Sequence, residues 1–136
     1  MPFYEFDITS PANTLQADPT EQLVSLNAGV ITHVAVQIPR GCVGLVHAQI
    51  WRADFQVWPT NPEGDFQGDN VFIEWDEEYV LEDEPLDLRL IIWNLDDSYA
   101  HTITFRFALQ PLPADAHPQA ASGLLVRVAR ALGIGG

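Results

Sequence analysis

The chain has 136 residues, 47% of them hydrophobic, and a formal net charge of −13 at pH 7, because 19 acidic residues stand against six arginines and no lysine. A surface this acidic repels phosphate backbones and anionic membranes, so neither a nucleic-acid partner nor a membrane partner is expected. The length predicts one domain with one hydrophobic core.

The N-terminal residues and the cysteine content bear on the compartment in which the protein works. The first five residues, Met-Pro-Phe-Tyr-Glu, have no cationic start and no long apolar run, which predicts neither a signal peptide nor a spanning helix. The single cysteine, Cys42, excludes an internal disulfide and is predicted to be a small buried hydrophobic residue. A nucleophilic role for this thiol would need a partner base that the sequence does not place beside it.

Alternating apolar and polar side chains predict short strands in the first 81 residues. A first strand is expected at residues 3–9, and the stretch 10–19, with two prolines, is expected to be a loop or an extended arm. Turn residues at Asn27-Ala28-Gly29 and at Pro39-Arg40-Gly41-Cys42 separate later strands. These strands are expected at residues 21–27, 30–38, 43–52, 55–58, 71–75 and 79–81.

The clearest alternation lies between residues 84 and 111. Apolar side chains occupy every second position from Leu86 to Ile92, and a second alternation runs from His101 to Leu109. Between them, residues 94–98 supply the short polar side chains that close turns by bonding their own backbone. We therefore predict a long β-hairpin.

These segments amount to about nine strands at spacings of about eight to twelve residues, which is typical of sandwiches and barrels. A hairpin with one apolar face needs a second layer to cover it. The predicted fold class is therefore all-β, an antiparallel β-sandwich of jelly-roll-like topology over residues 1–113.

Residues 114–136 break the pattern and are predicted to be a linker followed by a short amphipathic helix from Gln119 to Leu132, with Gly133 as its C-cap. The helix would either close one mouth of the sandwich or pack as an arm on a neighbouring subunit, and it is short and weakly charged for a membrane-surface helix. Its apolar face, which we expect at an interface, is formed by Leu124, Leu125, Val128 and Leu132.

The histidines do not form a recognisable reaction centre. A cupin-like metalloenzyme would need two histidines one residue apart and a nearby glutamate, whereas the segment His47-Ala48-Gln49 offers one ligand. His33 and His101 also fall in expected strands and His117 in the tail, so ordinary strand histidines satisfied by neighbours are the default. We predict no catalytic residues and no cofactor, and the cupin-like enzyme is the disfavoured alternative.

The polar loop at residues 61–70 is the best ligand-binding candidate. Ca²⁺ prefers hard oxygen ligands, but the spacing of the acids here is not that of an EF-hand. The competing interpretation is that the acids cap backbone N–H groups and keep an apolar protein in solution. The weak Ca²⁺ candidates are Glu63, Asp65, Asp69 and Asn70.

The four tryptophans are a second possible recognition feature. In at least two expected strands they fall on the opposite parity to the main apolar positions, which predicts an outward orientation. Outward aromatic side chains form either subunit contacts or carbohydrate contacts, and subunit contacts are favoured in a chain this apolar. The predicted interface residues are Trp51, Trp58, Trp75 and Trp93.

Three segments carry a resemblance. Residues 38–46 (IPRGCVGLV), 58–65 (WPTNPEGD) and 93–103 (WNLDDSYAHTI) resemble a pattern found in small β-sandwich virion structural proteins of tailed phages. The resemblance brings no catalytic residues with it. It implies a capsid decoration (cement) protein or a minor head or tail component, located in the virion, which often acts as a trimer on the shell.

The sequence therefore favours a non-enzymatic virion structural protein that stabilises an assembly through subunit contacts. Its expected partners are copies of itself, in a homo-oligomer, and a larger protein assembly such as a capsid shell. The alternative from another class is a carbohydrate-dependent or Ca²⁺-dependent binding module that uses the loop at residues 61–70 and the tryptophans.

Overall fold

A computed structural model of the chain describes residues 2–112. The helix expected at residues 119–132, with its predicted interface residues Leu124, Leu125, Val128 and Leu132, lies outside the described residues, as does His117. No helix long and apolar enough to cross a bilayer occurs within residues 2–112. The strands of this part are β1 (Phe3–Ser10), β2 (Thr20–Ser25), β3 (Gly29–Ile38), β4 (Val46–Arg52), β5 (Phe55–Trp58), β6 (Val71–Leu81), β7 (Asp87–Asn94) and β8 (His101–Pro111).

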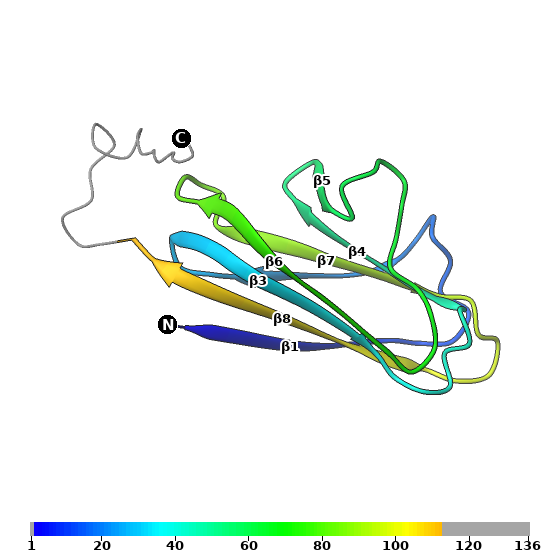
Figure 1. Ribbon diagram of the computed structural model, residues 1–136. Coiled ribbons are helices and arrows are strands. Elements are labelled where there is room, and N and C mark those ends of the chain that lie inside the picture. The colour runs from blue at the N-terminus through cyan, green and yellow to red at the C-terminus, as the bar shows by residue number, and fades with distance from the viewer. Residues whose placement is uncertain (1, 113–136) are drawn as a thin grey trace.

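The strands form two four-stranded sheets that face each other (Figure 1). One sheet has the order β1-β8-β3-β6 and the other β2-β7-β4-β5, and every pairing is antiparallel. The predicted all-β antiparallel sandwich is thus confirmed for residues 2–112. The inner faces of both sheets meet in one apolar core, as expected where alternating side chains give each sheet one oily face.

The predicted hairpin at residues 84–111 is wrong. Both strands exist, but β7 pairs with β2 and β4, whereas β8 pairs with β1 and β3, so they belong to opposite sheets. The polar connection between them crosses from one sheet to the other. The alternation of apolar and polar residues correctly predicts that each strand has one buried face. It carries no information on which strand lies beside it in the sheet.

The number of strands also differs from the prediction, because residues 71–75 and 79–81 form one continuous strand, β6. The register of β6 against β3 shifts between the pairs Ile31–Tyr79 and His33–Asp76, so a β-bulge absorbs one extra residue of the acidic run. The strand therefore continues through a segment that looks like an interruption in the sequence.

The core is formed by apolar side chains from both sheets. Burying a side chain of this size contributes about 1.5–3 kcal/mol, so such residues supply most of the favourable free energy of folding. Cys42 is fully buried, as predicted, and burial raises the pKa of its thiol. The largest fully buried side chains include Phe105, Phe107, Ile31, Ile38, Ile50, Leu81, Leu88, Leu90, Ile92, Ile103 and Leu109.

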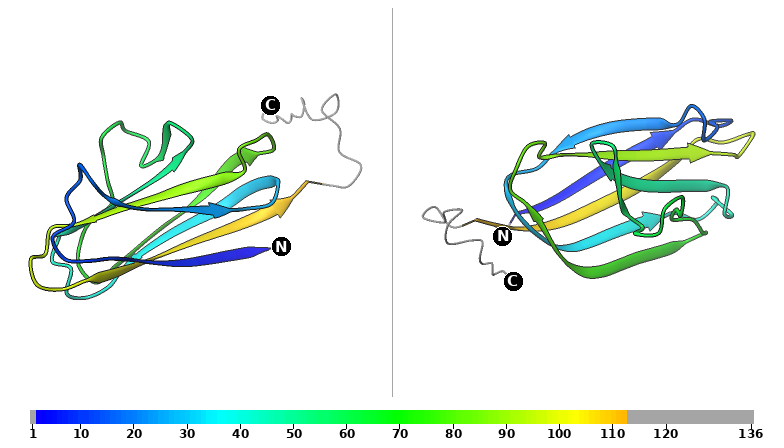
Figure 2. Two further views of the ribbon diagram at one scale, coloured as in Figure 1. Left: turned by 180° about the vertical axis from the view of Figure 1, so that it is seen from behind. Right: turned by 90° about the horizontal axis from the view of Figure 1, so that it is seen from above.

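The connections β1–β2, β3–β4 and β7–β8 gather at the end of the sandwich that lies away from the N-terminus (Figures 1 and 2). The long β5–β6 connection also reaches this end before β6 begins. We call the four segments at residues 11–19, 39–45, 59–70 and 95–100 the loop end. It is the part of the molecule where segments distant in sequence come together.

Candidate binding surfaces

Asp69 fixes the tip of the β3–β4 connection in the loop end. Its Oδ1 accepts hydrogen bonds from the backbone N–H groups of Gly41, at 2.8 Å, and Val43, at 2.9 Å. Both donors have positive φ angles, of 104° and 50°, a tight conformation that the carboxylate holds in place. The hydrogen bonds from Val43 and Gly41 are the main cause of the lowered pKa of Asp69.

Asp96 fixes the β7–β8 connection in a similar way. Its Oδ2 lies 2.8 Å from Nε2 of His101, and its Oδ1 accepts hydrogen bonds from the backbone N–H of Ser98, at 2.9 Å, and of Tyr99, at 3.3 Å. The hydrogen bond to His101 is the main cause of the lowered pKa of Asp96. Buried Asn94 completes this network, because its Nδ2 donates to the carbonyl of Tyr99 at 2.9 Å.

Backbone hydrogen bonds join the loops to one another. The N–H of Leu95 donates to the carbonyl of Leu45 at 2.9 Å, and the N–H of Asn13 donates to the carbonyl of Asp96 at 2.9 Å. Gly44 N–H donates to the carbonyl of Gly68 at 3.0 Å, which ties the β5–β6 connection to the same group. The loop end is therefore a cross-linked surface.

This cross-linked surface exposes large apolar side chains. Loops usually carry polar tips, and exposed apolar groups on a well-held framework are typical of protein-binding surfaces. Asp69, Asn94 and Asp96 are already engaged by the hydrogen bonds described above. The side chains are Leu15, Val43, Leu45, Leu95 and Tyr99, which are 61%, 71%, 38%, 43% and 69% exposed.

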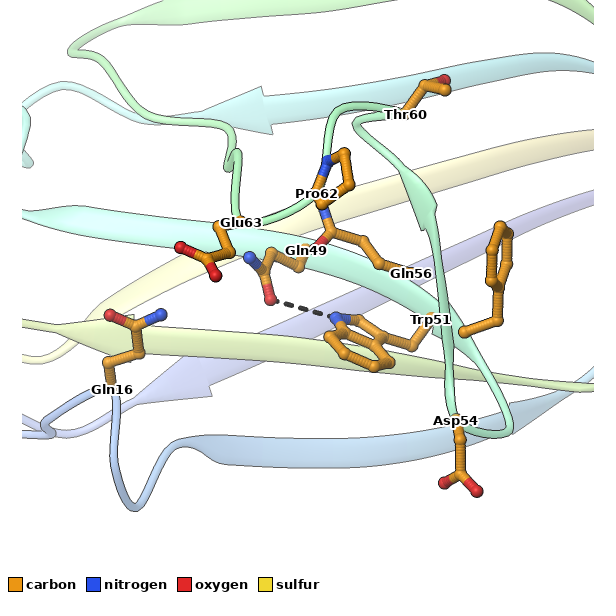
Figure 3. A pocket seen from close by; sticks show the side chains of 9 residues that line it. Gln16, Gln49, Trp51, Asp54, Gln56, Thr60, Pro62 and Glu63 are labelled. Atoms are coloured by element: carbon orange, nitrogen blue, oxygen red, sulfur yellow. Dashed lines mark hydrogen bonds between the residues drawn. The ribbon is translucent and has the colours of Figure 1, made fainter.

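A second surface lies on the outer face of the sheet β2-β7-β4-β5, where a pocket of about 350 Å³ opens beside Trp51 (Figure 3). Planar amides from Gln16, Gln49 and Gln56 line it together with Phe55. Two carboxylates, Asp54 and Glu63, and the side chains of Thr60 and Pro62 complete the wall. Pockets that combine an apolar surface with a few convergent polar groups are the usual sites of small ligands.

Hydrogen bonds hold the indole of Trp51 in one orientation. Its Nε1 donates to Oε1 of Gln49 at 3.0 Å, and Nε2 of Gln49 donates to the carbonyl of Gly64 at 2.8 Å. Gln56 Nε2 donates to the same carbonyl at 3.1 Å, so the β5–β6 connection is fastened over β4 and β5. The guanidinium of Arg89, 5.6 Å from the centre of the Trp51 ring, restrains the indole further.

Several polar side chains of the pocket wall remain available to a ligand. Gln16, Asp54 and Glu63 make no side-chain hydrogen bond to any residue in the range 2–112, although Asp54 contributes to the electrostatic field at Arg89. Figure 3 shows Glu63 and Gln16 on one side of the indole and Asp54 on the other. The pocket thus combines a fixed aromatic ring with free hydrogen-bonding groups.

The predicted outward orientation of the tryptophans holds for only part of the set. Trp58 is 5% exposed and belongs to the apolar core, so its predicted outward orientation is wrong. Trp93 lies outside the core cluster, opposite His47, but it is covered and only 4% exposed. Trp58 packs against Trp75 with ring centres 6.0 Å apart, where the edge strands β5 and β6 face each other, and Trp93 stacks on His47 at 5.2 Å. Trp51 and Trp75 are partly exposed, and an interface role for them stays a prediction.

The role of Glu77 is not among the predictions from the sequence. Its Oε1 accepts hydrogen bonds from the indole N–H groups of Trp58 and Trp75, both at 2.8 Å. Glu77 has the same inward parity along β6 as Trp75 and Tyr79, but reading the acidic run as a break between two strands hid this alternation.

The described histidines are strand residues with carboxylate partners, as the default interpretation predicted. His33 bonds Asp76 and Glu74, both at 3.0 Å, and the pKa of His33 is raised, mainly by the hydrogen bond to Asp76. His47 bonds Asp65 at 2.7 Å, and His101 bonds Asp96. The three pairs lie at separate places on the sandwich.

The structure does not bring the four Ca²⁺ candidates together as one ligand set. Asp65 bonds His47, Asp69 bonds the β3–β4 backbone and Glu63 lines the pocket, so three carboxylates have three different surroundings. Asn70, at a φ of 51°, donates its backbone N–H to the carbonyl of Pro39. Within residues 2–112 no group of three or more His, Cys, Asp or Glu side chains could hold a metal ion.

Comparisons with known proteins do not identify a family. No family model matches the chain, and no curated protein matches it. Among solved structures, the chain is similar to PliG of Aeromonas hydrophila, a periplasmic lysozyme inhibitor of g-type lysozyme, with 12% sequence identity and a TM-score of 0.40. The likeness covers 79% of this chain and 86% of that chain. A likeness at this level indicates neither a shared ligand nor a shared function.

Proposed function

We propose that this protein is a non-enzymatic structural component of a virus particle, a capsid decoration protein or a minor head or tail protein, that binds a larger protein assembly through its loop end. The observation that carries the proposal is the meeting in space of the three segments that resemble tailed-phage virion proteins. Residues 38–46 and 93–103 are joined by the hydrogen bond between Leu95 and Leu45. Residues 58–65 reach the same region, because Asp65 bonds His47, whose ring stacks on Trp93.

The order of the strands supports a jelly-roll assignment. Successive strands of the chain lie in opposite sheets, except that β4 and β5 are neighbours in the same sheet. The last strand, β8, lies beside the first, β1. Eight-stranded jelly rolls occur in viral capsid proteins, in lectins and in cupins. A fold alone does not decide among these functions, so the choice depends on the surface.

The surface supports a protein partner. The loop end exposes five large apolar side chains on a framework in which Asp69 is occupied by backbone N–H groups and Asp96 by backbone N–H groups and a histidine. The chain as a whole carries −13, which would keep free copies soluble and apart and would repel nucleic acid. Burial of the apolar side chains against a shell or a neighbouring subunit would remove them from water.

The proposal is tested by changing the apolar character of the loop end. The double variant Leu45→Asp with Leu95→Asp is expected to abolish homo-oligomers measured by light scattering and to abolish co-sedimentation with particles from cells that also express the neighbouring genes. The matched control is Phe3→Asp with Val80→Asp, which adds the same charge at exposed apolar positions outside the loop end. The control is expected to assemble like the unchanged protein.

Two results would contradict the proposal. One is a stable monomer that sediments with no particle. The other is that the loop-end variant still assembles whereas the control variant does not. That result would show that the contact lies on another face of the protein.

A further inference from the structure

The pocket beside Trp51 does not include the exposed apolar side chains of the loop end, although part of its wall, Gln16, Thr60, Pro62 and Glu63, comes from loop-end segments. It is built on β4, β5 and the start of the β5–β6 connection, with Gln16 reaching it from the β1–β2 connection. Its volume, about 350 Å³, falls at the lower end of the range of small-molecule sites, which is about 300–1,000 Å³. The pocket therefore has the size of a site for a small molecule or for one end of a chain molecule.

The pocket is rigid before any ligand arrives. Trp51 is held through Gln49, and Gln49 and Gln56 both donate to the carbonyl of Gly64. A ligand would meet a preformed wall and would not have to order the loop, which removes one of the main costs of binding.

The chemistry of the wall matches a ring molecule that carries several hydroxyl groups. The aromatic side chains of Trp51 and Phe55 offer apolar surface that can pack against the C–H face of a pyranose ring. The free amide of Gln16 can both donate and accept, and the carboxylates of Asp54 and Glu63 can accept hydrogen bonds from hydroxyl groups. Hydroxyl groups are themselves donors and acceptors, so they can satisfy all three side chains.

Charge selects among ligand classes. Two carboxylates in the wall and a net charge of −13 disfavour sulfated, phosphorylated or sialylated ligands. A compact cation is also a poor match, because Glu63 and Asp54 lie on opposite sides of the indole, and Arg89 already occupies the cation position over Trp51. A neutral ligand long enough to reach both sides fits best.

We propose that the pocket bounded by Trp51, Phe55, Gln16, Gln56, Asp54 and Glu63 is a binding site for neutral oligosaccharides. The indole of Trp51 packs against one sugar ring, and the free polar groups on its two sides bind hydroxyl groups of that ring and the next. The site needs no metal ion.

The test uses the full chain on an array of neutral oligosaccharides built from glucose, galactose, mannose and N-acetylhexosamines, with calorimetry for each sugar that binds. Trp51→Ala is expected to weaken binding by about tenfold or more, the loss of roughly 1.4 kcal/mol of contact. Gln16→Ala, in an exposed loop with no internal side-chain bond to lose, is expected to weaken binding by about threefold or more. Phe72→Ala, which removes an exposed aromatic ring on the outer face of the other sheet, is expected to leave binding unchanged.

Carboxylate-to-amide changes separate this proposal from binding of a cationic group. Glu63→Gln and Asp54→Asn keep an acceptor for a hydroxyl group, so most sugar affinity is expected to remain, with little change between about 0.05 and about 0.5 M NaCl. Three outcomes would overturn the proposal: no oligosaccharide binds, a bound oligosaccharide binds Trp51→Ala equally well, or only cationic peptides bind and their binding is lost in Glu63→Gln and in high salt. Because the loop-end variant leaves this pocket intact, failure of the assembly proposal and failure of the sugar site are distinguishable.

Discussion

Glu77 shows how one residue decides the packing at the open edge of the sandwich. Its carboxylate accepts the indole N–H groups of Trp58 and Trp75 where β5 and β6 face each other. Removing the acceptor leaves two donors in a largely apolar setting, and an unsatisfied buried donor costs about 1–3 kcal/mol. We therefore expect Glu77→Ala to lower the free energy of unfolding by about 1–3 kcal/mol in urea titrations.

Two comparisons define this prediction. Glu77→Gln keeps an acceptor and is expected to lose less stability than Glu77→Ala. Glu78→Ala, at the exposed neighbouring position, is expected to change stability by no more than about 0.5 kcal/mol. Equal losses for Glu77→Ala and Glu78→Ala would mean that the indole hydrogen bonds do not hold the edge.

Asp96 gives the loop end a dependence on pH. A carboxyl group whose pKa is lower in the folded than in the unfolded state stabilises the fold above the unfolded pKa, and this contribution is lost as the pH falls through the folded pKa. The pKa of Asp96 is lowered, mainly by the hydrogen bond to His101. Asp96→Asn is therefore expected to be less stable than the unchanged protein at pH 7, and the difference is expected to shrink between about pH 5 and about pH 2.

Urea unfolding at a series of pH values measures this difference. Asp97→Asn serves as the control, because Asp97 is exposed and its Oδ1 bonds only the neighbouring hydroxyl of Ser98. A stability difference for Asp96→Asn that is constant across the acid range would show that the carboxylate charge plays no part.

At the scale of elements, β6 is an edge strand of 11 residues, a length that invites pairing with other molecules. Its exposed positions include Glu74, Asp76 and Glu78, and charge along an edge is a common defence against such pairing. We expect the triple variant Glu74→Gln, Asp76→Asn, Glu78→Gln to remain folded by circular dichroism and to aggregate at lower concentrations than the unchanged protein.

The matched control changes the same number of charges in the connection that follows β6, with Glu82→Gln, Asp83→Asn and Glu84→Gln. Dynamic light scattering of both variants over a concentration series measures the effect. If the two variants aggregate alike, the cause is the lower net charge of the whole chain and not the position of the acids on the edge.

The same element shows how far sequence reasoning reaches. Alternation located nearly every strand, because a half-buried strand must place an apolar side chain at every second position. It split β6 in two, because Glu77 places an acid on the face that Trp75 and Tyr79 otherwise make apolar, which interrupts the apolar alternation. It also joined β7 and β8 into a hairpin, because Asp96 and its neighbours form the same local turn bonds whether the next strand pairs beside β7 or crosses to the other sheet.

The candidate sites were predictable to different degrees. Parity along β4 places Gln49 and Trp51 on one outward face, and this signal could have indicated the aromatic floor of the pocket. Gln16 and Glu63 come from connections whose path over the sheet depends on tertiary hydrogen bonds such as those to Gly64. No local pattern in the sequence encodes such a path.

For the whole molecule, the net charge of −13 and the apolar loop end act against each other during self-association. Apolar burial favours contact between copies, whereas long-range repulsion between acidic bodies opposes it. Salt screens the repulsion, since the Debye length falls from about 10 Å at 0.1 M to about 3 Å at 1 M, and it leaves apolar contacts intact. Sedimentation velocity is therefore expected to show a larger oligomeric fraction at about 0.5 M than at about 0.05 M NaCl.

The direction of this salt effect identifies the kind of contact. If copies associated through arginine–carboxylate pairs such as those that Arg89 and Arg106 form within the chain, salt would weaken the oligomer. The Leu45→Asp, Leu95→Asp variant supplies the control, because it should stay monomeric at both salt concentrations if the loop end is the contact. An oligomer that dissociates as salt is added, in the unchanged protein, would contradict the apolar docking surface and favour a polar interface elsewhere on the sandwich.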